Sequence, residues 1–252
     1  EGGKRLDSAY NFDFLYAPRL TAPLVRASLS QWSGEPGEGW PSWAFSNHDA
    51  PRAVTRWTLD GDMARAARLN LLLLLSLRGN PIIYQGEELG LTQVDIPFEL
   101  LQDPEAIANW PLTLSRDGAR TPMPWVSTEA GGGFTSGSPW LPLGEENLAR
   151  AVDVQDDAEH SLLNLNRTLL QLRRSCPALR LGSFDVAHVD ERLLVVQRAF
   201  GSQTITGLFN LSAQASDWPE TVATDGIPIV AVNGAMPGLL PPFGGLLIHG
   251  EG

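Results

Sequence analysis

Cysteine is nearly absent from this sequence of 252 residues, which contains only Cys176. An intrachain disulfide is therefore excluded, and so is a zinc cluster built from several cysteines. Long apolar runs are missing too: the longest, Leu71 to Leu75, is far shorter than the roughly 20 residues that cross a bilayer. No apolar signal core follows the first residues. We expect no membrane association and a cytoplasmic location, with the periplasm as the open alternative.

Basic residues are also scarce. The sequence has 18 Lys and Arg residues against 29 Asp and Glu residues, which gives a net charge of -11. Proteins that bind nucleic acid usually present a basic surface, so we do not expect a nucleic-acid partner. An acidic surface is compatible with a neutral ligand such as a sugar. With 43% apolar and 19% charged residues, the composition predicts a globular protein of one large or two ordinary domains.

Strand and helix patterns alternate in the first 177 residues. Short apolar runs at Trp43–Ser46 and Pro81–Tyr84 predict strands, and the segment Ala64–Leu77, dense in Leu and Ala, predicts a helix that stops at Gly79. Strand, helix and strand in this order favour a right-handed crossover between parallel strands. Leucines at helical spacing predict a further helix at residues 158–174.

Two other segments do not follow this alternation. Residues 85–153 are rich in Gly, Pro and Trp and predict a long irregular segment, which in a folded domain is usually functional. Residues 178–252 contain short strand patterns separated by turn residues, which predict a small antiparallel β domain. We therefore place a domain boundary between residues 177 and 178. The strand patterns lie at residues 192–198, 204–211, 228–232 and 245–249.

The segment FSNHDAPR, residues 45–52, holds the first candidate for chemistry. It delivers Asn47, His48 and Asp49 at the C-terminal end of a predicted strand. In parallel α/β barrels, active sites are built at that end of the strands. A neutral histidine can hydrogen-bond sugar hydroxyls, and a carboxylate can stabilise positive charge at an anomeric carbon. Taken alone, the triplet is also typical of a polar turn in which the aspartate is a local cap.

Two more motifs follow in order, GNPIIYQGEELG at residues 79–90 and SRDGARTPMPW at residues 115–125. Together with FSNHDAPR they resemble the α-amylase family of glycoside hydrolases, and more narrowly its α-glucosidase and oligo-1,6-glucosidase branch. The segment IPFELLQDP at residues 96–104 looks like bacterial members of that branch, and GGKRLDSAYNFDFL at residues 2–15 resembles the sixth barrel strand and its lead-in. The resemblance covers essentially the whole chain.

The resemblance implies an α/β fold, the C-terminal part of a (β/α)8 TIM barrel followed by a small antiparallel β-sandwich domain. Residues 1–177 would supply the barrel part, and residues 178–252 the sandwich. On this template Tyr10–Leu15, Trp43–Ser46 and Pro81–Tyr84 are barrel strands six, seven and eight. The helix at 158–174 is then the eighth barrel helix.

The resemblance also implies site roles. Asp49 matches the third catalytic carboxylate, which stabilises an oxocarbenium-like transition state, and His48 matches a histidine that binds hydroxyls of the same glucose. Arg116 or Arg120 matches the arginine that fixes the glucose at the non-reducing end. An internal ion pair is the alternative for such an arginine. Arg52, like Glu87, lies beside the site by sequence and is expected to support it without contacting substrate.

Two carboxylates are missing from this picture. Retaining glycosidases need a nucleophile and an acid/base about 5 Å apart, and in this family both come from earlier strands. We therefore expect the N-terminal half of the same barrel as a partner, as a separate or cleaved chain. A pairing of Asp49 with Glu87 or Glu88 is the alternative, although nothing in the family supports it. No cofactor site is visible in the sequence, and a structural calcium, which some family members carry, would lie in the missing half.

The function that these matches imply is a retaining, exo-acting α-glucosidase. It would hydrolyse terminal α-glucosidic bonds of small oligosaccharides or α-glucosides, and transfer of glucose to an acceptor alcohol is a variant of the same chemistry. The alternative is a non-catalytic interaction subunit of the same fold.

Overall fold

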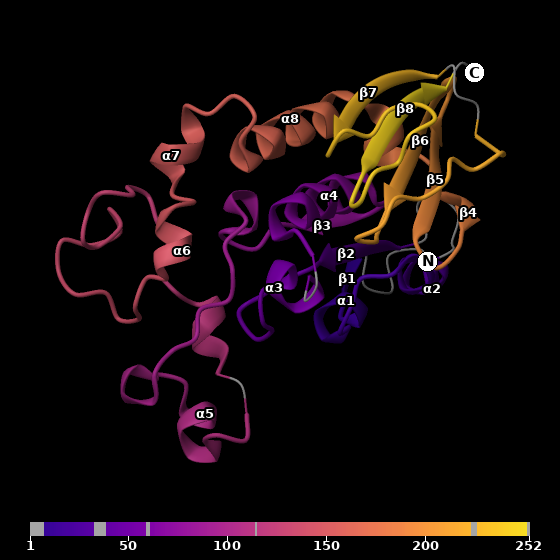
Figure 1. Ribbon diagram of the computed structural model, residues 1–252. Coiled ribbons are helices and arrows are strands. Elements are labelled where there is room, and N and C mark those ends of the chain that lie inside the picture. The colour runs from indigo at the N-terminus through magenta and orange to yellow at the C-terminus, as the bar shows by residue number, and fades with distance from the viewer. Residues whose placement is uncertain (1–7, 33–38, 59–60, 114, 223–225, 251–252) are drawn as a thin grey trace.

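The computed structural model describes residues 8–32, 39–58, 61–113, 115–222 and 226–250. Residues 2–7 of the predicted lead-in lie outside these ranges. A parallel sheet with helices packed on it is followed by an antiparallel sheet, and the two are joined through one hydrophobic core (Figure 1).

Three parallel strands form the first sheet, in the order β1-β2-β3. They are β1 (Ser8–Asn11), β2 (Trp40–Ala44) and β3 (Asn80–Ile82). The predicted parallel arrangement and the crossover through a helix are confirmed. Because all three strands run the same way, their C-terminal ends meet at one edge of the sheet.

The strand limits differ from the prediction. The first strand was expected at Tyr10–Leu15, but β1 ends at Asn11, because the Asn11 side chain accepts a hydrogen bond from the backbone N–H of Asp13 and turns the chain into a short helix. The second strand begins at Trp40, before Pro41. This proline is tolerated near the start of β2, where pairing with β3 has not begun: that pairing starts at Ser42.

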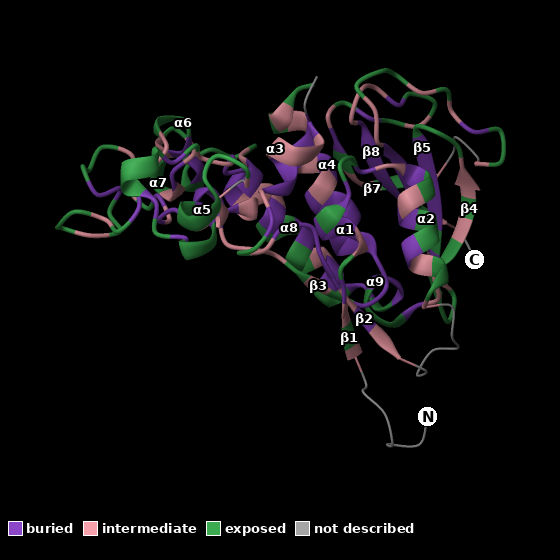
Figure 2. Ribbon diagram, turned by 90° about the horizontal axis from the view of Figure 1, so that it is seen from below, coloured by how far each residue is buried: buried purple, intermediate pink, exposed green. Residues whose placement is uncertain are grey.

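Helix α4 is the centre of the core. Asp62 caps its first turn by accepting hydrogen bonds from the backbone N–H groups of Ala64 and Arg65. The run Leu71 to Leu75 is buried all round, because α4 contacts α8 on one side and the antiparallel sheet on another. In Figure 2 the inner part of α4 is buried, whereas α2 shows a buried stripe and an exposed outer face. The helices of this part are α1 (Asp13–Tyr16), α2 (Ala22–Ser30), α3 (Ala53–Trp57), α4 (Met63–Ser76), α8 (Leu162–Ser175) and α9 (Pro177–Leu181).

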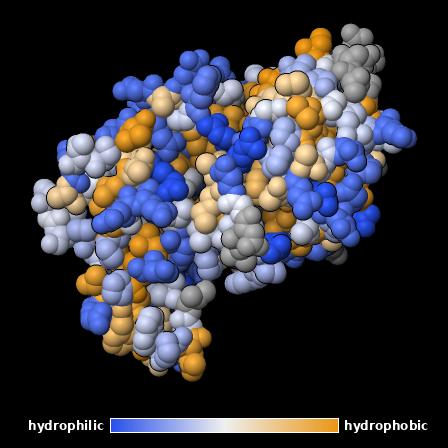
Figure 3. All heavy atoms as spheres, in the orientation of Figure 1, coloured by the Kyte–Doolittle hydropathy of each residue, from blue (hydrophilic) through white to orange (hydrophobic). Residues whose placement is uncertain are grey.

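The irregular segment forms an arm that projects to one side of the parallel sheet (Figure 1). Its described residues form only short helices of three to six residues. The expected helix at residues 158–174 begins late, at Leu162, because Ser161 caps it. Apolar side chains, including the exposed Trp110 and Leu112, gather on the lobe around α5 (Figure 3). The elements are η1 (Glu87–Leu89), η2 (Phe98–Leu100), α5 (Pro104–Asn109), η3 (Arg116–Ala119), α6 (Glu145–Leu148) and α7 (Val152–Asp156).

The antiparallel sheet has the order β4-β5-β6-β8-β7. One face, with Leu194 and Phe209, packs into the core around α4. The other, with Leu208 and Leu246, is covered by residues of the connections that precede and follow β7, namely Trp218, Val222, Ala235 and Leu240. In the described residues that covering layer pairs only through isolated bridges, so it is irregular rather than a second full sheet. The strands are β4 (Asp185–Val189), β5 (Leu193–Phe200), β6 (Gln203–Asn210), β7 (Ile227–Val232) and β8 (Gly245–Gly250).

A buried arginine holds the end of α4 in place. Arg173 of α8 donates hydrogen bonds to the carbonyl oxygens of Leu75, Leu77 and Gly79, at 2.6, 3.0 and 2.7 Å. These carbonyls lie where α4 ends and β3 begins, so a positive charge there also suits the helix dipole. Burial lowers the pKa of Arg173 to about 10, which leaves it charged at neutral pH.

In the part of the chain that the structure describes, no helix reaches the length and hydropathy that crossing a membrane requires.

Candidate active site

Asp49 lies in the turn that follows β2, at the edge where the parallel strands end. The side-chain oxygen of Asn47 accepts hydrogen bonds from the backbone N–H groups of Asp49 and Ala50, both at 2.9 Å, and so shapes the turn. The turn presents its polar side chains outward: His48 is 66% exposed and Asp49 is 44% exposed. A carboxylate is thus held in an open position at the C-terminal ends of parallel strands, as the sequence predicted.

The structure brings the other three predicted site residues, His48, Arg116 and Arg120, to this carboxylate. One oxygen of Asp49, Oδ2, lies 3.3 Å from Nε2 of His48. The other, Oδ1, lies 3.0 Å from Nη2 of Arg120 and 3.6 Å from Nη1 of Arg116. Both arginines come from the arm, more than 60 residues further along the chain, at η3 and the residue after it.

Arg120 positions the turn as well as the carboxylate. Its Nε donates a hydrogen bond of 2.8 Å to the backbone carbonyl of His48, while its Nη2 bonds to Asp49. The guanidinium therefore bonds to the main chain and to a side chain of the same turn. A lysine, whose charge is concentrated at one point, could not hold both partners in this geometry.

Arg116 forms an internal ion pair and also faces the candidate site, the two alternatives that the sequence left open for it. It forms an internal ion pair with Asp103, to which it donates hydrogen bonds through Nε, Nη2 and its backbone N–H. Its remaining Nη1 is directed to Asp49. The side chain of Asp103 is completely buried, and the Arg116 guanidinium holds the pKa of that carboxyl well below its usual range.

Asp103 and Asp117 are support residues that sequence reasoning did not find. Asp117 is buried, and its Oδ2 accepts hydrogen bonds from the backbone N–H groups of Gln102 and Asp103, at 2.7 and 2.8 Å. It thereby holds the loop that carries Asp103 against η3. The available signal was an aspartate directly before a proline at residues 103–104, which is a typical start of a helix, but its pairing with an arginine 13 residues later depends on the loop's path.

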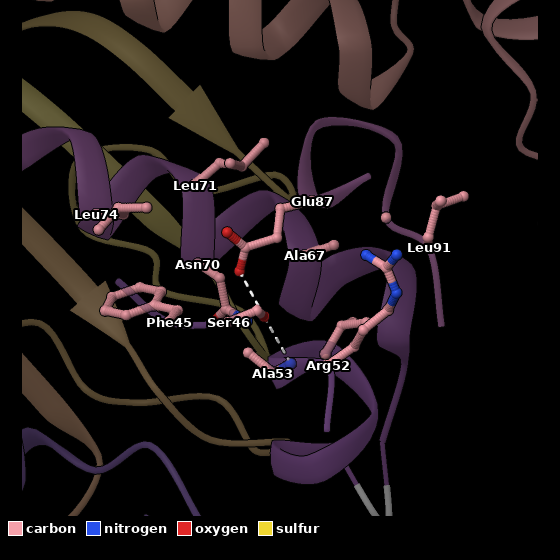
Figure 4. Close-up of a pocket in the computed structure, with 12 residues that line it drawn as sticks. Phe45, Ser46, Arg52, Ala53, Ala67, Asn70, Leu71, Leu74, Glu87 and Leu91 are labelled. Carbon is pink, nitrogen blue, oxygen red and sulfur yellow. Dashed lines mark hydrogen bonds between the residues drawn. The ribbon is translucent and has the colours of Figure 1, made fainter. Parts of the chain in front are cut away.

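Arg52 and Glu87 form hydrogen bonds that hold together the turns around the site. Arg52 is buried and donates hydrogen bonds to the carbonyl oxygens of Gln85 and Ala119, at 2.8 and 3.2 Å, which ties η3 to the turn after β3. Burial lowers its pKa. Both oxygens of Glu87 accept hydrogen bonds from neighbouring residues, and its carboxylate points toward Ser46 (Figure 4). This arrangement favours a positioning role for Glu87 over a role as a paired catalytic carboxylate.

Tyr10 of β1 is a further residue beside the site that the sequence did not single out. It forms a hydrogen bond with Asn47, and burial raises the pKa of its hydroxyl. The bond links the first strand to the turn that carries Asp49. Within the described ranges, no group of three or more His, Cys, Asp or Glu residues is placed to hold a metal ion. The calcium that the resemblance puts in the N-terminal half stays a prediction.

Comparison with models of known protein families identifies the family to which the chain belongs. Residues 9–182 match the model of the α-amylase catalytic domain. This chain belongs to the α-amylase family. The match covers the parallel strands, the arm and all four predicted site residues.

Similar proteins include α-glucosidases, oligo-1,6-glucosidases and glucan 1,6-α-glucosidases. A probable alpha-glucosidase of Rhizobium meliloti is 42% identical over 217 residues, which are 85% of this chain and 39% of that protein. An oligo-1,6-glucosidase of Parageobacillus thermoglucosidasius is 30% identical, over 75% of this chain and 37% of that protein. The chain therefore spans about two fifths of the length of these relatives.

Solved structures agree on the fold. The alpha-glucosyl transfer enzyme XgtA superimposes with a TM-score of 0.89 and 39% identity, over 99% of this chain and 47% of that one. The trehalulose synthase MutB from Pseudomonas mesoacidophila MX-45 gives a TM-score of 0.84 at 24% identity, over 98% of this chain and 51% of that one, and shows the fold alone. The predicted fold, the end of a (β/α)8 TIM barrel followed by an antiparallel β domain, is confirmed.

Proposed function

We propose that this chain is the C-terminal half of a retaining, exo-acting α-glucosidase that acts on terminal α-glucosidic bonds of small oligosaccharides or α-glucosides. The observation that carries the proposal is the carboxylate of Asp49, open to solvent at the ends of the parallel strands and bracketed by His48, Arg116 and Arg120. A non-catalytic relative would have no need to keep this arrangement.

The chemistry assigned to Asp49 is stabilisation of charge. In a retaining mechanism one carboxylate attacks the anomeric carbon as the bond to the leaving oxygen breaks, and a second carboxyl protonates that oxygen. In this proposal both groups come from the N-terminal half. As the sugar ring gains oxocarbenium character, the negative charge of Asp49 binds it more strongly than the neutral ground state, which lowers the barrier.

Recognition of the terminal glucose is assigned to the residues around Asp49. Arg116 is locked by Asp103 and Arg120 by the carbonyl of His48, so their free N–H groups have set directions. Fixed donors beside a carboxylate suit the vicinal hydroxyls of a single sugar ring, each of which both donates and accepts hydrogen bonds. Such a closed set of contacts around one glucose supports action at a chain end.

Water and an acceptor alcohol can each release the glucosyl group from the nucleophile. Similarity to an alpha-glucosyl transfer enzyme as well as to α-glucosidases supports both outcomes for this protein. We include transglucosylation in the proposal as a second fate of the same covalent intermediate.

The barrel needs its N-terminal half as a partner. Among the described residues, β1 and β3 each pair on one side only, and Ala9, Asn80 and Ile82 are exposed on them. Strand edges left open in this way favour further pairing. An N-terminal half that adds the remaining strands between β3 and β1 would close the barrel and bring the nucleophile and acid/base to the edge where Asp49 lies.

The test is an Asp49→Asn substitution in the whole protein, assayed on an aryl α-glucoside. We expect a fall in kcat of about a hundredfold to a thousandfold, on the scale of other electrostatic groups in active sites, with less change in KM. Asp62→Asn is the matched control, because Asp62 is also an exposed aspartate at a turn and asparagine caps a helix equally well. An Asp49→Asn protein with near-normal activity, or a wild-type protein without any, would contradict the proposal and favour the interaction subunit.

A further inference from the structure

Glu87 forms a clamp between the ends of two neighbouring strands. Its Oε1 accepts a hydrogen bond of 2.7 Å from the hydroxyl of Ser46, the second residue after β2, and its Oε2 accepts one of 2.8 Å from the backbone N–H of Tyr84, the second residue after β3. One carboxylate thus joins the two turns that leave the candidate site edge of the sheet.

Ser46 links Glu87 to both ends of the turn that carries Asp49. It lies directly before Asn47, His48 and Asp49, and its hydroxyl oxygen accepts a hydrogen bond of 2.9 Å from the backbone N–H of Ala53, the first residue of α3. Figure 4 shows the continuous line from Glu87 through Ser46 to Ala53. The start and the end of the turn 46–53 are therefore held by one hydroxyl, and that hydroxyl is held by Glu87.

We propose that Glu87 is a positioning residue for the reaction: through Ser46 it fixes the turn that presents Asp49, and it does so only as a carboxylate. This proposal rests on the proposed function, since it assigns a role in the same site. Within the described ranges, Glu87 forms no hydrogen bond or ion pair with the four residues assigned to the sugar, His48, Asp49, Arg116 and Arg120.

The donors around Glu87 explain why the ionised form is required. Both of its oxygens face donors, the Ser46 hydroxyl and the Tyr84 N–H. A proton on Oε2 would point at the Tyr84 N–H. A proton on Oε1 would force the Ser46 hydroxyl to accept twice, from Glu87 and from Ala53, and to find another acceptor for its own hydrogen. A proton on Oε2 costs the Tyr84 bond, and a proton on Oε1 leaves the Ser46 hydrogen without its acceptor, so either protonated form weakens the clamp.

Burial places the ionisation of Glu87 near neutral pH. Burial raises the pKa of Glu87 to about 7, against the lowering effects of the Ser46 and Tyr84 bonds and of the positive Arg52. The other titratable groups that face it are Glu88 beside it in η1, Arg56 of α3 and Tyr10 of β1. Because the clamp needs the carboxylate, it is present above pH 7 and is lost as the pH falls through about 7.

A small cavity gives the carboxylate room to rearrange when it is protonated. It has a volume of about 20 Å³ and is lined by Ser46, Glu87 and Asn70 among mostly apolar neighbours. This is space for about one water molecule. A water there can solvate a Glu87 side chain that has released Ser46, so the protonated state is accessible without unfolding.

The experiment compares Glu87→Gln with Glu88→Gln in the whole protein, over a range of pH. The Glu87→Gln substitution keeps the size of the side chain but turns one acceptor into a donor, so it imitates the protonated state. Glu88 is the matched control, because its carboxylate accepts backbone N–H groups of residues 86 and 88 and takes no part in the Ser46 line. We expect wild type and Glu88→Gln to lose kcat/KM below a pKa near 7.

Glu87→Gln should instead have kcat lowered about tenfold to a hundredfold at about pH 8, with KM changed less than about threefold, and no ionisation near 7. Ser46→Ala should lower kcat to a similar degree. A double variant with Glu87→Gln and Ser46→Ala should have a kcat little lower than either single variant, because both substitutions break the same chain of hydrogen bonds. Thermal melting confirms that each variant is folded.

Three results would overturn the proposal. They are a Glu87→Gln protein with wild-type kcat, one that retains the ionisation near 7, and full additivity with Ser46→Ala. If Asp49→Asn is inactive while Glu87→Gln is normal, only this inference fails. If Asp49→Asn is active, the proposed function fails as well.

Discussion

Replacing Asp103 with asparagine should reduce both the stability and the activity of the protein. Asp103 is completely buried and accepts four hydrogen bonds, three from Arg116 and one from the backbone N–H of Glu105. An asparagine can present its oxygen to only one pair of these donors. Its amide N–H₂ then faces the other pair, so one bond from the Arg116 guanidinium and one from a backbone N–H are lost whichever way the amide is turned.

The size of the effect follows from these two bonds. Hydrogen bonds that involve a charged group each contribute about 1.5–3 kcal/mol, which would give a loss of about 3 kcal/mol or more. Arg116 is 33% exposed, so its guanidinium can recover part of the loss by turning toward water. We therefore expect the free energy of unfolding to fall by about 2 kcal/mol. Because Nη1 of the same guanidinium faces Asp49, kcat/KM should fall as well.

Urea unfolding, monitored by tryptophan fluorescence, measures the first effect. The control is Asp156→Asn, which removes a similar aspartate–arginine pair, with Arg167, that is about half exposed on the surface. Surface pairs contribute about 0–1 kcal/mol, so this control should change the free energy of unfolding by less than Asp103→Asn. Equal effects of the two substitutions, or a change below about 0.5 kcal/mol for Asp103→Asn, would refute the reasoning from burial.

The pH dependence gives a second check with a definite sign. The folded-state pKa of Asp103 is lowered below its unfolded value, so its contribution to stability is complete above about pH 4 and is lost as the pH falls toward the folded pKa. The difference between wild type and Asp103→Asn should therefore be constant from about pH 5 to 8 and shrink below about pH 4.

Three further substitutions test other parts of the structure. Arg173→Met leaves three buried carbonyls without their donor and should lower the free energy of unfolding, measured in urea, by about 3 kcal/mol. The same substitution at the exposed neighbour, Arg174→Met, should change it little, and equal changes would be inconsistent with the carbonyl cap. Gly79→Ala should cost about 2 kcal/mol or more, because φ is +124° and a Cβ would lie 2.4 Å from the Pro41 carbonyl oxygen; an unchanged melting temperature would argue against this backbone path. Arg120→Lys should lower kcat/KM about tenfold, because lysine cannot hold the His48 carbonyl and Asp49 together, and wild-type kinetics would show that this double contact is unimportant.

Local patterns in the sequence were sufficient for the main elements. The leucine-rich segment after Asp62 reads as a helix whatever its neighbours are, because capping and side-chain period depend on residues within a few positions. Four of the five strands of the tail are predictable for the same reason, whereas β4 (Asp185–Val189) was not predicted. The end of β1 was misplaced, because it depends on the single bond between the Asn11 side chain and Asp13, which competes with strand pairing.

Motifs in the sequence identified Asp49, His48, Arg116 and Arg120 as site residues, but not how they divide the work. That Arg120 holds the turn while Arg116 is held by Asp103 depends on the path of an arm with no regular period. The same is true of Asp117 behind Asp103, and of the clamp from Glu87 to Ser46.

The sequence by itself therefore determined the family, the strand–helix alternation, the antiparallel tail and the residues of the candidate site. Only the tertiary structure decided which arginine bonds to which carboxylate, and which carboxylate is buried to the point that its pKa approaches 7. The physical reason is the distance along the chain over which each interaction acts. Helix period, capping and turn formation act over a few residues, whereas burial and charge pairing depend on groups that lie tens of residues apart in the chain and meet only when it is folded.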